Sequence, residues 1–275
     1  MKRQKRIAVI NDFSGFGRCS LMVSAPIISA MKVQCCALPT AIFSNHTGYD
    51  EYFFDDYTDK MKKYYSYWEK LGLEFDGIYT GFLGSVRQVE IVGDFIERFA
   101  KKDTAIIVDP VMGDNGRCYD TIDDAFRIEL RRLLPVSTII TPNLTEACLL
   151  AGTEYREYGA DEKALEEIAL RLRELGAENI VITGVQDGND ICDYVYSGDG
   201  RAVLLKQPSG GTAHAGTGDV FASVIAADAV NGIDFIASVK KAAAFVGRAI
   251  RLSDEMNIPA QDGVCFEEIL CELAE

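Results

Sequence analysis

The chain is organised around residues 210–227, which read GGTAHAGTGD and then VFASVIAA. A glycine-rich loop therefore leads directly into an apolar segment that predicts a helix, an arrangement common in α/β proteins. Glycine lets the backbone adopt unusual angles, and the first N–H groups of a helix have no partner within it and attract anions. The stretch predicts a pocket for a phosphoryl group at the start of this helix.

Asp219 ends the glycine-rich loop, where a carboxylate repels a bound anion unless it faces a neutral hydroxyl and takes its proton. This position favours a general base, with the backbone of Gly216, Thr217 and Gly218 as an anion hole. The structural alternative is that an acid in a first helical turn is simply favoured by the helix dipole. The loop lacks the lysine of a Walker A sequence.

The composition restricts the possible partners and compartments. The chain has 275 residues and a formal net charge of -14, which argues against nucleic acid because such binding depends on basic patches. The basic start is followed by only four apolar residues, 7–10, and no apolar run is long enough to span a bilayer. The eight cysteines show neither metal-site spacing nor a disulfide framework, so we expect a cytoplasmic protein with reduced thiols.

Apolar strand-like runs alternate with helical patterns along most of the chain. We predict strands at 7–10, 33–38, 77–80, 105–108, 137–140 and 179–184, and helices at 57–71, 85–101, 164–175, 219–231, 235–251 and from 266. Residues 191–197 and 201–206 predict an antiparallel hairpin at the sheet edge. Alternation of this kind indicates a mostly parallel sheet covered by helices, and no linker divides residues 1–275 into separate domains.

Polar residues follow several of the predicted strands, and ligands of parallel sheets bind beyond the carboxyl ends of the strands. Residues 38–49 read LPTAIFSNHTGY, a loop dense in hydrogen-bonding and aromatic side chains that predicts one wall of a ligand site. Its alternative is an ordinary turn in which His46 is structural. Residues 15–17 read GFG but lack the third glycine of a dinucleotide fingerprint.

Four separated segments together resemble the ribokinase-like superfamily, and within it the pyridoxal kinase family. They are FSNHTGY at 43–49, DPVMGD at 109–114, ITPNLTE at 140–146 and GTGD at 216–219. The resemblance implies one kinase domain over residues 1–275, a three-layer αβα sandwich with a central mostly parallel sheet and an antiparallel edge hairpin. It also implies ATP-dependent phosphorylation of the 5'-hydroxymethyl group of a vitamin B6 vitamer, with Mg²⁺, a monovalent cation such as K⁺, and a cytoplasmic homodimer.

The resemblance assigns roles to individual residues. Asp219 is the expected base, with the loop Gly216, Thr217 and Gly218 around the transferred phosphate. The expected nucleotide-binding residues are Asp114, Tyr119, Thr141, Asn143, Glu146, Thr183 and Thr217. The expected substrate-binding residues are Asp12, Ser44, Asn45, His46, Thr47, Tyr79 and Asp219. The expected metal-side carboxylates are Asp109, Asp114 and Glu146, although Asn143 followed by Glu146 is also the spacing of a helix capping box.

Two features keep an alternative substrate open. Residues 11–14 read NDFS where pyridoxal kinases carry Ser-His-Val, and Asp12 with residues 39–41 (PTA) resembles the hydroxymethylpyrimidine kinases. Asp12 could accept a hydrogen bond from a ring hydroxyl or from a pyrimidine amino group. The alternatives are therefore a hydroxymethylpyrimidine (phosphate) kinase of thiamine synthesis, or a non-catalytic vitamer or nucleotide sensor on the same fold.

Overall fold

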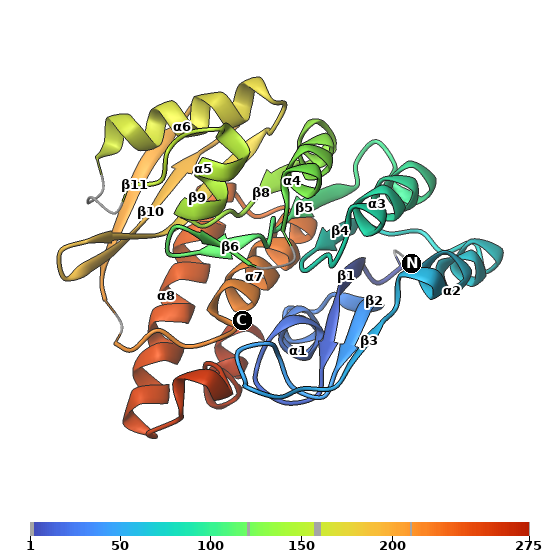
Figure 1. Ribbon diagram of the computed structural model, residues 1–275, viewed down its shortest axis with the longest axis horizontal. Coiled ribbons are helices and arrows are strands. Elements are labelled where there is room, and N and C mark those ends of the chain that lie inside the picture. The colour runs from blue at the N-terminus through green and yellow to red at the C-terminus, as the bar shows by residue number, and fades with distance from the viewer. Residues whose placement is uncertain (1–2, 120–121, 157–160, 210, 275) are drawn as a thin grey trace. The chain divides into compact units, whose positions relative to one another are not determined.

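The computed structural model describes residues 3–119, 122–156, 161–209 and 211–274 (Figure 1). Gly210, the first residue of the glycine-rich stretch, lies outside the described residues. The chain divides into two compact units, which are Met1–Ala105 with Gly210–Glu275 (unit 1) and Ile106–Ser209 (unit 2). Among the described residues, no helix combines the length and apolar character needed to cross a membrane.

Unit 1 contains a sheet flanked by helices. Its strands are β1 (Arg6–Ser14), β2 (Gln34–Phe43), β3 (Phe54–Asp56) and β4 (Gly77–Thr80), and its helices are α1 (Ser20–Ala30), α2 (Thr58–Lys70), α3 (Val86–Phe99), α7 (Thr217–Asn231) and α8 (Phe235–Glu255), with short 3₁₀ helices at Ala260–Asp262 and Glu267–Ala274. The strands follow the order β4-β1-β2-β3. β1 runs parallel to both β2 and β4, and β3 runs antiparallel to β2.

The position of β1 identifies where unit 1 can bind a ligand. The chain passes from β1 to β2 on one side and later adds β4 on the other side of β1. Such a reversal of strand order leaves a crevice beyond the carboxyl end of the strand from which the order diverges. Asn11 and Asp12 lie in the carboxyl-terminal half of β1, so they are the first residues to examine.

The core of unit 1 is built from the apolar run of β1 and from helices packed on the sheet. Residues 7–10 are fully buried. Helices α1 and α7 both contact β1 and each other, α7 contacts α8, and α2 contacts β2 and α3. The helix predicted at residues 57–71 carries aromatic side chains that are partly internal: Tyr65 and Trp68 make ring contacts with Phe95 of α3, whereas Tyr67 is 55% exposed.

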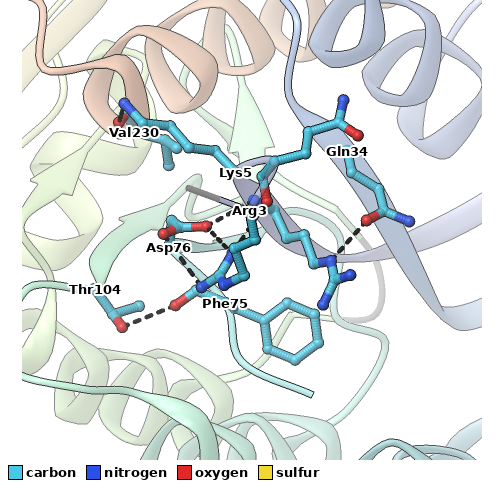
Figure 2. A network of polar contacts seen from close by, with 9 residues as sticks. Arg3, Lys5, Gln34, Phe75, Asp76, Thr104 and Val230 are labelled. Atoms are coloured by element: carbon cyan, nitrogen blue, oxygen red, sulfur yellow. Dashed lines mark hydrogen bonds and ion pairs between the residues drawn. The ribbon is translucent and has the colours of Figure 1, made fainter. Parts of the chain in front are cut away.

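A polar network fixes the amino ends of β1 and β4 (Figure 2). Arg3 donates to Asp76 at 2.6 Å, and the backbone N–H of Arg6 donates to the same carboxylate at 2.8 Å. The ammonium group of Lys5 donates to the carbonyl oxygen of Val230 at 2.7 Å, which ties this strand to the end of α7. Arg3, Lys5 and Arg6 are therefore part of the folded unit 1.

Unit 2 contains a second run of strands with its own helices. Its elements are β5 (Ala105–Val108, which begins at the last residue of unit 1), β6 (Gly113–Asp114), β7 (Arg117–Cys118), α4 (Asp124–Leu130), a 3₁₀ helix (Arg131–Val136), β8 (Ile139–Ile140), α5 (Leu144–Ala151), α6 (Glu162–Glu174), β9 (Asn179–Asp187), β10 (Asp190–Tyr196) and β11 (Ala202–Pro208). The order is β11-β10-β9-β8-β5, with β5, β8 and β9 parallel. The antiparallel partners β10 and β11 end this order, as the predicted edge hairpin requires.

Among the differences between the structure and the sequence predictions, two concern regions beside β1. The second strand was predicted to end at residue 38, but β2 continues to Phe43, so most of the predicted loop before Ser44 is strand. Helix α1 was not predicted, because its sequence SLMVSAPIISA is apolar on all sides and contains Pro26, so it shows no helical periodicity. Both regions adjoin β1 and help to surround its carboxyl end.

Candidate active site

The glycine-rich loop is held against the turn that follows β1. Gly216 is the N-cap of α7 with a φ of 76°, and a Cβ atom at this position would overlap the carbonyl oxygen of Arg18. The backbone of Ala215 donates to the carbonyl of Ala260 at 3.0 Å and accepts from the N–H of Val264 at 3.0 Å. The start of α7 is thus fixed from two sides by backbone contacts.

Asp219 lies in the first turn of α7 and is half-buried. Its Oδ1 accepts a hydrogen bond from Nδ2 of Asn11 at 3.1 Å, and its carboxylate also accepts from the backbone N–H of Ser20. The surroundings of Asp219 together raise its pKa to about 6: burial has the largest effect, the nearby charge of Asp12 also raises the pKa, and the two hydrogen bonds partly oppose the rise. An ionised carboxylate whose pKa lies near neutrality can accept a proton from a hydroxyl group.

The orientation of Asn11 is determined by its other contacts. Its Oδ1 accepts from the backbone N–H of Asp12 at 3.0 Å and from that of Phe82 at 2.8 Å. The amide group must therefore direct its Nδ2 toward Asp219. Asn11 was not among the predicted site residues, although its position directly after the buried run 7–10 was an available signal.

Asp12 is buried and faces two serine hydroxyl groups. Ser14 donates to its Oδ2 at 2.8 Å, and Ser20 donates to its Oδ1 at 2.5 Å. Burial raises the pKa of Asp12, and the two serine hydrogen bonds oppose this effect. Both carboxylate oxygens of Asp12 thus have protein partners.

The expected substrate wall at residues 44–47 is a compact loop. Ser44 donates to Oδ1 of Asn45 at 2.7 Å and accepts from the N–H of Phe53 at 2.8 Å, and Nδ2 of Asn45 donates to the carbonyl of Glu51 at 2.9 Å. His46 has contacts at both ring nitrogens, with the carbonyl of Gln261 at 2.7 Å and the N–H of Gly48 at 3.0 Å. These three side chains shape the loop, so their role as substrate ligands remains a prediction.

Two further expected substrate residues of unit 1 lie in different settings. Thr47 is exposed, and its hydroxyl group has no hydrogen-bond partner among the described residues. Tyr79 lies in β4 and is fully buried in the core of unit 1. Thr47 is therefore the better candidate for a direct contact with a ligand.

In unit 2, Glu146 forms the capping box that its spacing from Asn143 predicts. The side chain of Asn143 accepts from the N–H of Glu146 at 3.0 Å, and Oε2 of Glu146 accepts from the N–H of Asn143 at 2.9 Å. Oε1 of Glu146 accepts from the N–H of Met112 at 3.0 Å. Burial raises the pKa of Glu146. This carboxylate stabilises the start of α5 and the preceding loop.

The other expected nucleotide and metal residues of unit 2 lie around this cap. Nδ2 of Asn143 donates to the carbonyl of Gly113 at 2.8 Å, which holds β6 and therefore the exposed Asp114 near α5. Asn143 also forms an isolated parallel bridge with Thr183. Elsewhere in the unit, Thr141 donates to Oδ1 of the buried Asp109 at 2.9 Å, and the side chain of Tyr119 is 47% exposed.

Comparison with known proteins identifies the family. Residues 27–264 match the phosphomethylpyrimidine kinase family model. The chain belongs to the phosphomethylpyrimidine kinase family. It is 32% identical to a hydroxymethylpyrimidine/phosphomethylpyrimidine kinase of Haemophilus influenzae over 183 residues, which is 65% of this chain and 65% of that enzyme.

Solved structures match nearly the whole chain. A Bacteroides thetaiotaomicron protein assigned to the phosphomethylpyrimidine kinases is 38% identical, with a TM-score of 0.95 over 100% of this chain and 95% of that one. A second crystal form of that protein contains pyridoxal. The pyridoxal kinase of Lactobacillus plantarum is 27% identical, with a TM-score of 0.89 over 99% and 97% of the two chains. The prediction of a ribokinase-like fold is confirmed. Pyridoxal kinases, which the sequence was predicted to resemble, are among the relatives of this chain.

Gly216 and Gly218 give a matched test of the geometry of the loop. Gly216→Ala should lower the free energy of unfolding by about 2 kcal/mol or more, because it adds strain at a positive φ and overlaps a backbone carbonyl. Gly218→Ala should change stability by less than about 0.5 kcal/mol, because its Cβ would meet no atom within 4 Å. Denaturant unfolding of both variants measures the difference, and equal stabilities would contradict the close packing of Gly216.

Proposed function

We propose that this protein transfers the γ-phosphoryl group of ATP to the hydroxymethyl group of a vitamin B6 vitamer. The observation that carries the proposal is Asp219, held by two N–H donors in the first turn of a helix that follows a glycine-rich loop. The B6 substrate is supported by the 38% identical relative that was crystallised with pyridoxal and that matches 99% of this chain. It is also supported by the FSNHTGY sequence at 43–49.

In the proposed mechanism, ionised Asp219 takes the proton of the substrate hydroxymethyl group. The resulting oxygen attacks the γ-phosphorus of ATP, the bond from that phosphorus to the bridging oxygen breaks, and ADP leaves. The N–H groups of Thr217 and Gly218 belong to the first turn of α7, where they lack intrahelical acceptors and can donate to phosphate oxygens. The space beside the Cα of Gly218 is open, so a phosphate group can approach the backbone closely there.

We propose that residues of unit 2 hold the nucleotide and its Mg²⁺. Among the described residues no three His, Cys, Asp or Glu side chains gather to form a metal cage. This fits Mg²⁺, which proteins usually bind through one or two carboxylates together with waters and substrate phosphates. Glu146 and the exposed Asp114 are the proposed carboxylates, and Mg²⁺ would neutralise charge on the phosphates. Asp109 with Thr141 is the proposed position for K⁺.

Hydroxymethylpyrimidine is the second candidate substrate. It is favoured by the family model over residues 27–264 and by the Haemophilus influenzae relative. Both substrates carry a hydroxymethyl group on a nitrogen-containing aromatic ring, so Asp219 has the same role for either. A non-catalytic sensor is less well supported, because the base and the glycines of the loop are all present.

Glu146 and Asp114 allow the metal role to be separated from the capping role. Both Glu146→Gln and Asp114→Asn should raise the Mg²⁺ concentration needed for half-maximal activity several-fold. Only Glu146→Gln should also lower stability, by about 0.5–2 kcal/mol, because an amide nitrogen cannot accept the N–H bond that the carboxylate accepts. Magnesium titrations and thermal melts measure both effects. Reduced stability with unchanged magnesium dependence would leave Glu146 as a helix cap only.

A substrate panel tests the proposed function. We expect wild-type kcat/KM with ATP to be highest for pyridoxal, pyridoxine or pyridoxamine, lower for hydroxymethylpyrimidine, and negligible for ribose and adenosine. Thr47→Val should raise KM for the ring substrate by about 2–10-fold and leave KM for ATP unchanged, because one neutral hydrogen bond is lost. A preference for hydroxymethylpyrimidine would move the assignment to the second candidate, and a preference for ribose or adenosine would overturn both.

A further inference from the structure

Ser20 has an unusual backbone conformation at a position that touches the proposed base. Its φ is 54°, one of four positive values among the described non-glycine residues. The left-handed region is unfavourable for residues with a Cβ atom, and such conformations persist only where surrounding contacts enforce them. Ser20 is also the first residue of α1, and its backbone N–H donates to the carboxylate of Asp219.

The side chain of Ser20 is bound by Asp12. The hydroxyl group of Ser20 donates to Oδ1 of Asp12 at 2.5 Å, and both side chains are buried. The N-cap residue of α1, Cys19, provides no side-chain hydrogen bond to the helix. The carboxylate of Asp219 instead accepts from the first N–H group of α1, that of Ser20. The chain thus links Asp12 on β1, Ser20 on α1 and Asp219 on α7 through two consecutive hydrogen bonds.

We propose that Asp12 is a positioning residue for the base: it holds Ser20 in the left-handed conformation that directs the Ser20 N–H at Asp219. This inference rests on the proposed role of Asp219 and extends it to a residue that sequence analysis assigned to substrate binding. The contacts of Asp12 support it, because each of its carboxylate oxygens accepts a hydrogen bond from a serine of the protein, Ser14 or Ser20.

The proposal separates the effect of Asp12 from that of a substrate ligand. A positioning residue acts on the chemical step, so its loss lowers kcat while KM for the ring substrate changes little. A ligand of the ring would raise that KM instead. Replacing Ser20 by glycine distinguishes the two roles further, because glycine adopts a positive φ without steric cost and needs no hydrogen bond from its side chain to stay there.

The test compares four forms of the full-length protein. Asp12→Ala should lower kcat by about tenfold, because the left-handed conformation of residue 20 costs roughly 1–2 kcal/mol and the hydrogen bond that offsets this cost is lost. Asp12→Ala combined with Ser20→Gly should recover most of this loss. Ser14→Ala is the matched control, because it removes the hydrogen bond to the other oxygen of Asp12 and leaves Ser20 in place, and its kcat should stay within about twofold of the wild-type value.

Two outcomes would overturn the proposal. One is a rise in KM for the ring substrate at unchanged kcat in Asp12→Ala, which would make Asp12 a substrate ligand. The other is a loss of kcat that Ser20→Gly does not recover, provided that circular dichroism and thermal melts show both variants folded.

Crystal structures of the same proteins give a readout that does not depend on the substrate. Asp12→Ala should show residue 20 outside the left-handed region and without its contact to residue 219, and the double variant should restore both. Wild-type protein inactive on every ring substrate, with these structural changes present, would reject the proposed function and retain the coupling of Asp12 to Asp219.

Discussion

The arrangement of unit 1 depends on the close approach of two backbone segments, at Gly216 and Arg18. No side chain fits between the Cα of Gly216 and the carbonyl oxygen of Arg18, so glycine with a positive φ is the residue that allows α7 to begin there. Because α7 begins there, Asp219 meets Asn11 of β1 and the first N–H of α1. Asp219, the proposed base, is thereby held by contacts among α7, β1 and α1, an arrangement more rigid than a side chain on an isolated loop.

The electrostatics of this cluster explain how an acidic protein can place two carboxylates close together. Burial raises the cost of ionising both Asp12 and Asp219, and the charge of Asp12 adds to that cost for Asp219. Hydroxyl donors compensate Asp12, and an amide and a backbone N–H compensate Asp219. The hydrogen bonds favour the ionised form of Asp219, while burial and the charge of Asp12 keep its pKa near 6, above the value of an exposed aspartate.

Sequence patterns predicted the parts of this structure that have local signatures. The alternation of apolar runs and helical periodicity located most strands and helices, the glycine loop located the start of α7, and the Asn143 to Glu146 spacing predicted the capping box. Helix α1 was missed because it is apolar on every side. The contact of Ser20 with Asp219 was not predicted because a left-handed serine leaves no mark in a single sequence. For Asn11, the position after the buried run 7–10 was a signal, but its partner Asp219 is 208 residues away in the chain and could not be identified from the sequence.

The central claim is that Asp219 acts as a base rather than as a helix-terminal acid, and Asp219→Asn tests it directly. Asparagine is nearly isosteric and keeps the start of α7, but it cannot take a proton. At about pH 8 and saturating substrates we expect kcat to fall by about 10²–10⁴-fold. Wild-type kcat should also decline as the pH falls through about 6, because protonated Asp219 is inactive, and the variant should lack this decline. A folded variant within a few-fold of wild-type kcat would contradict the account.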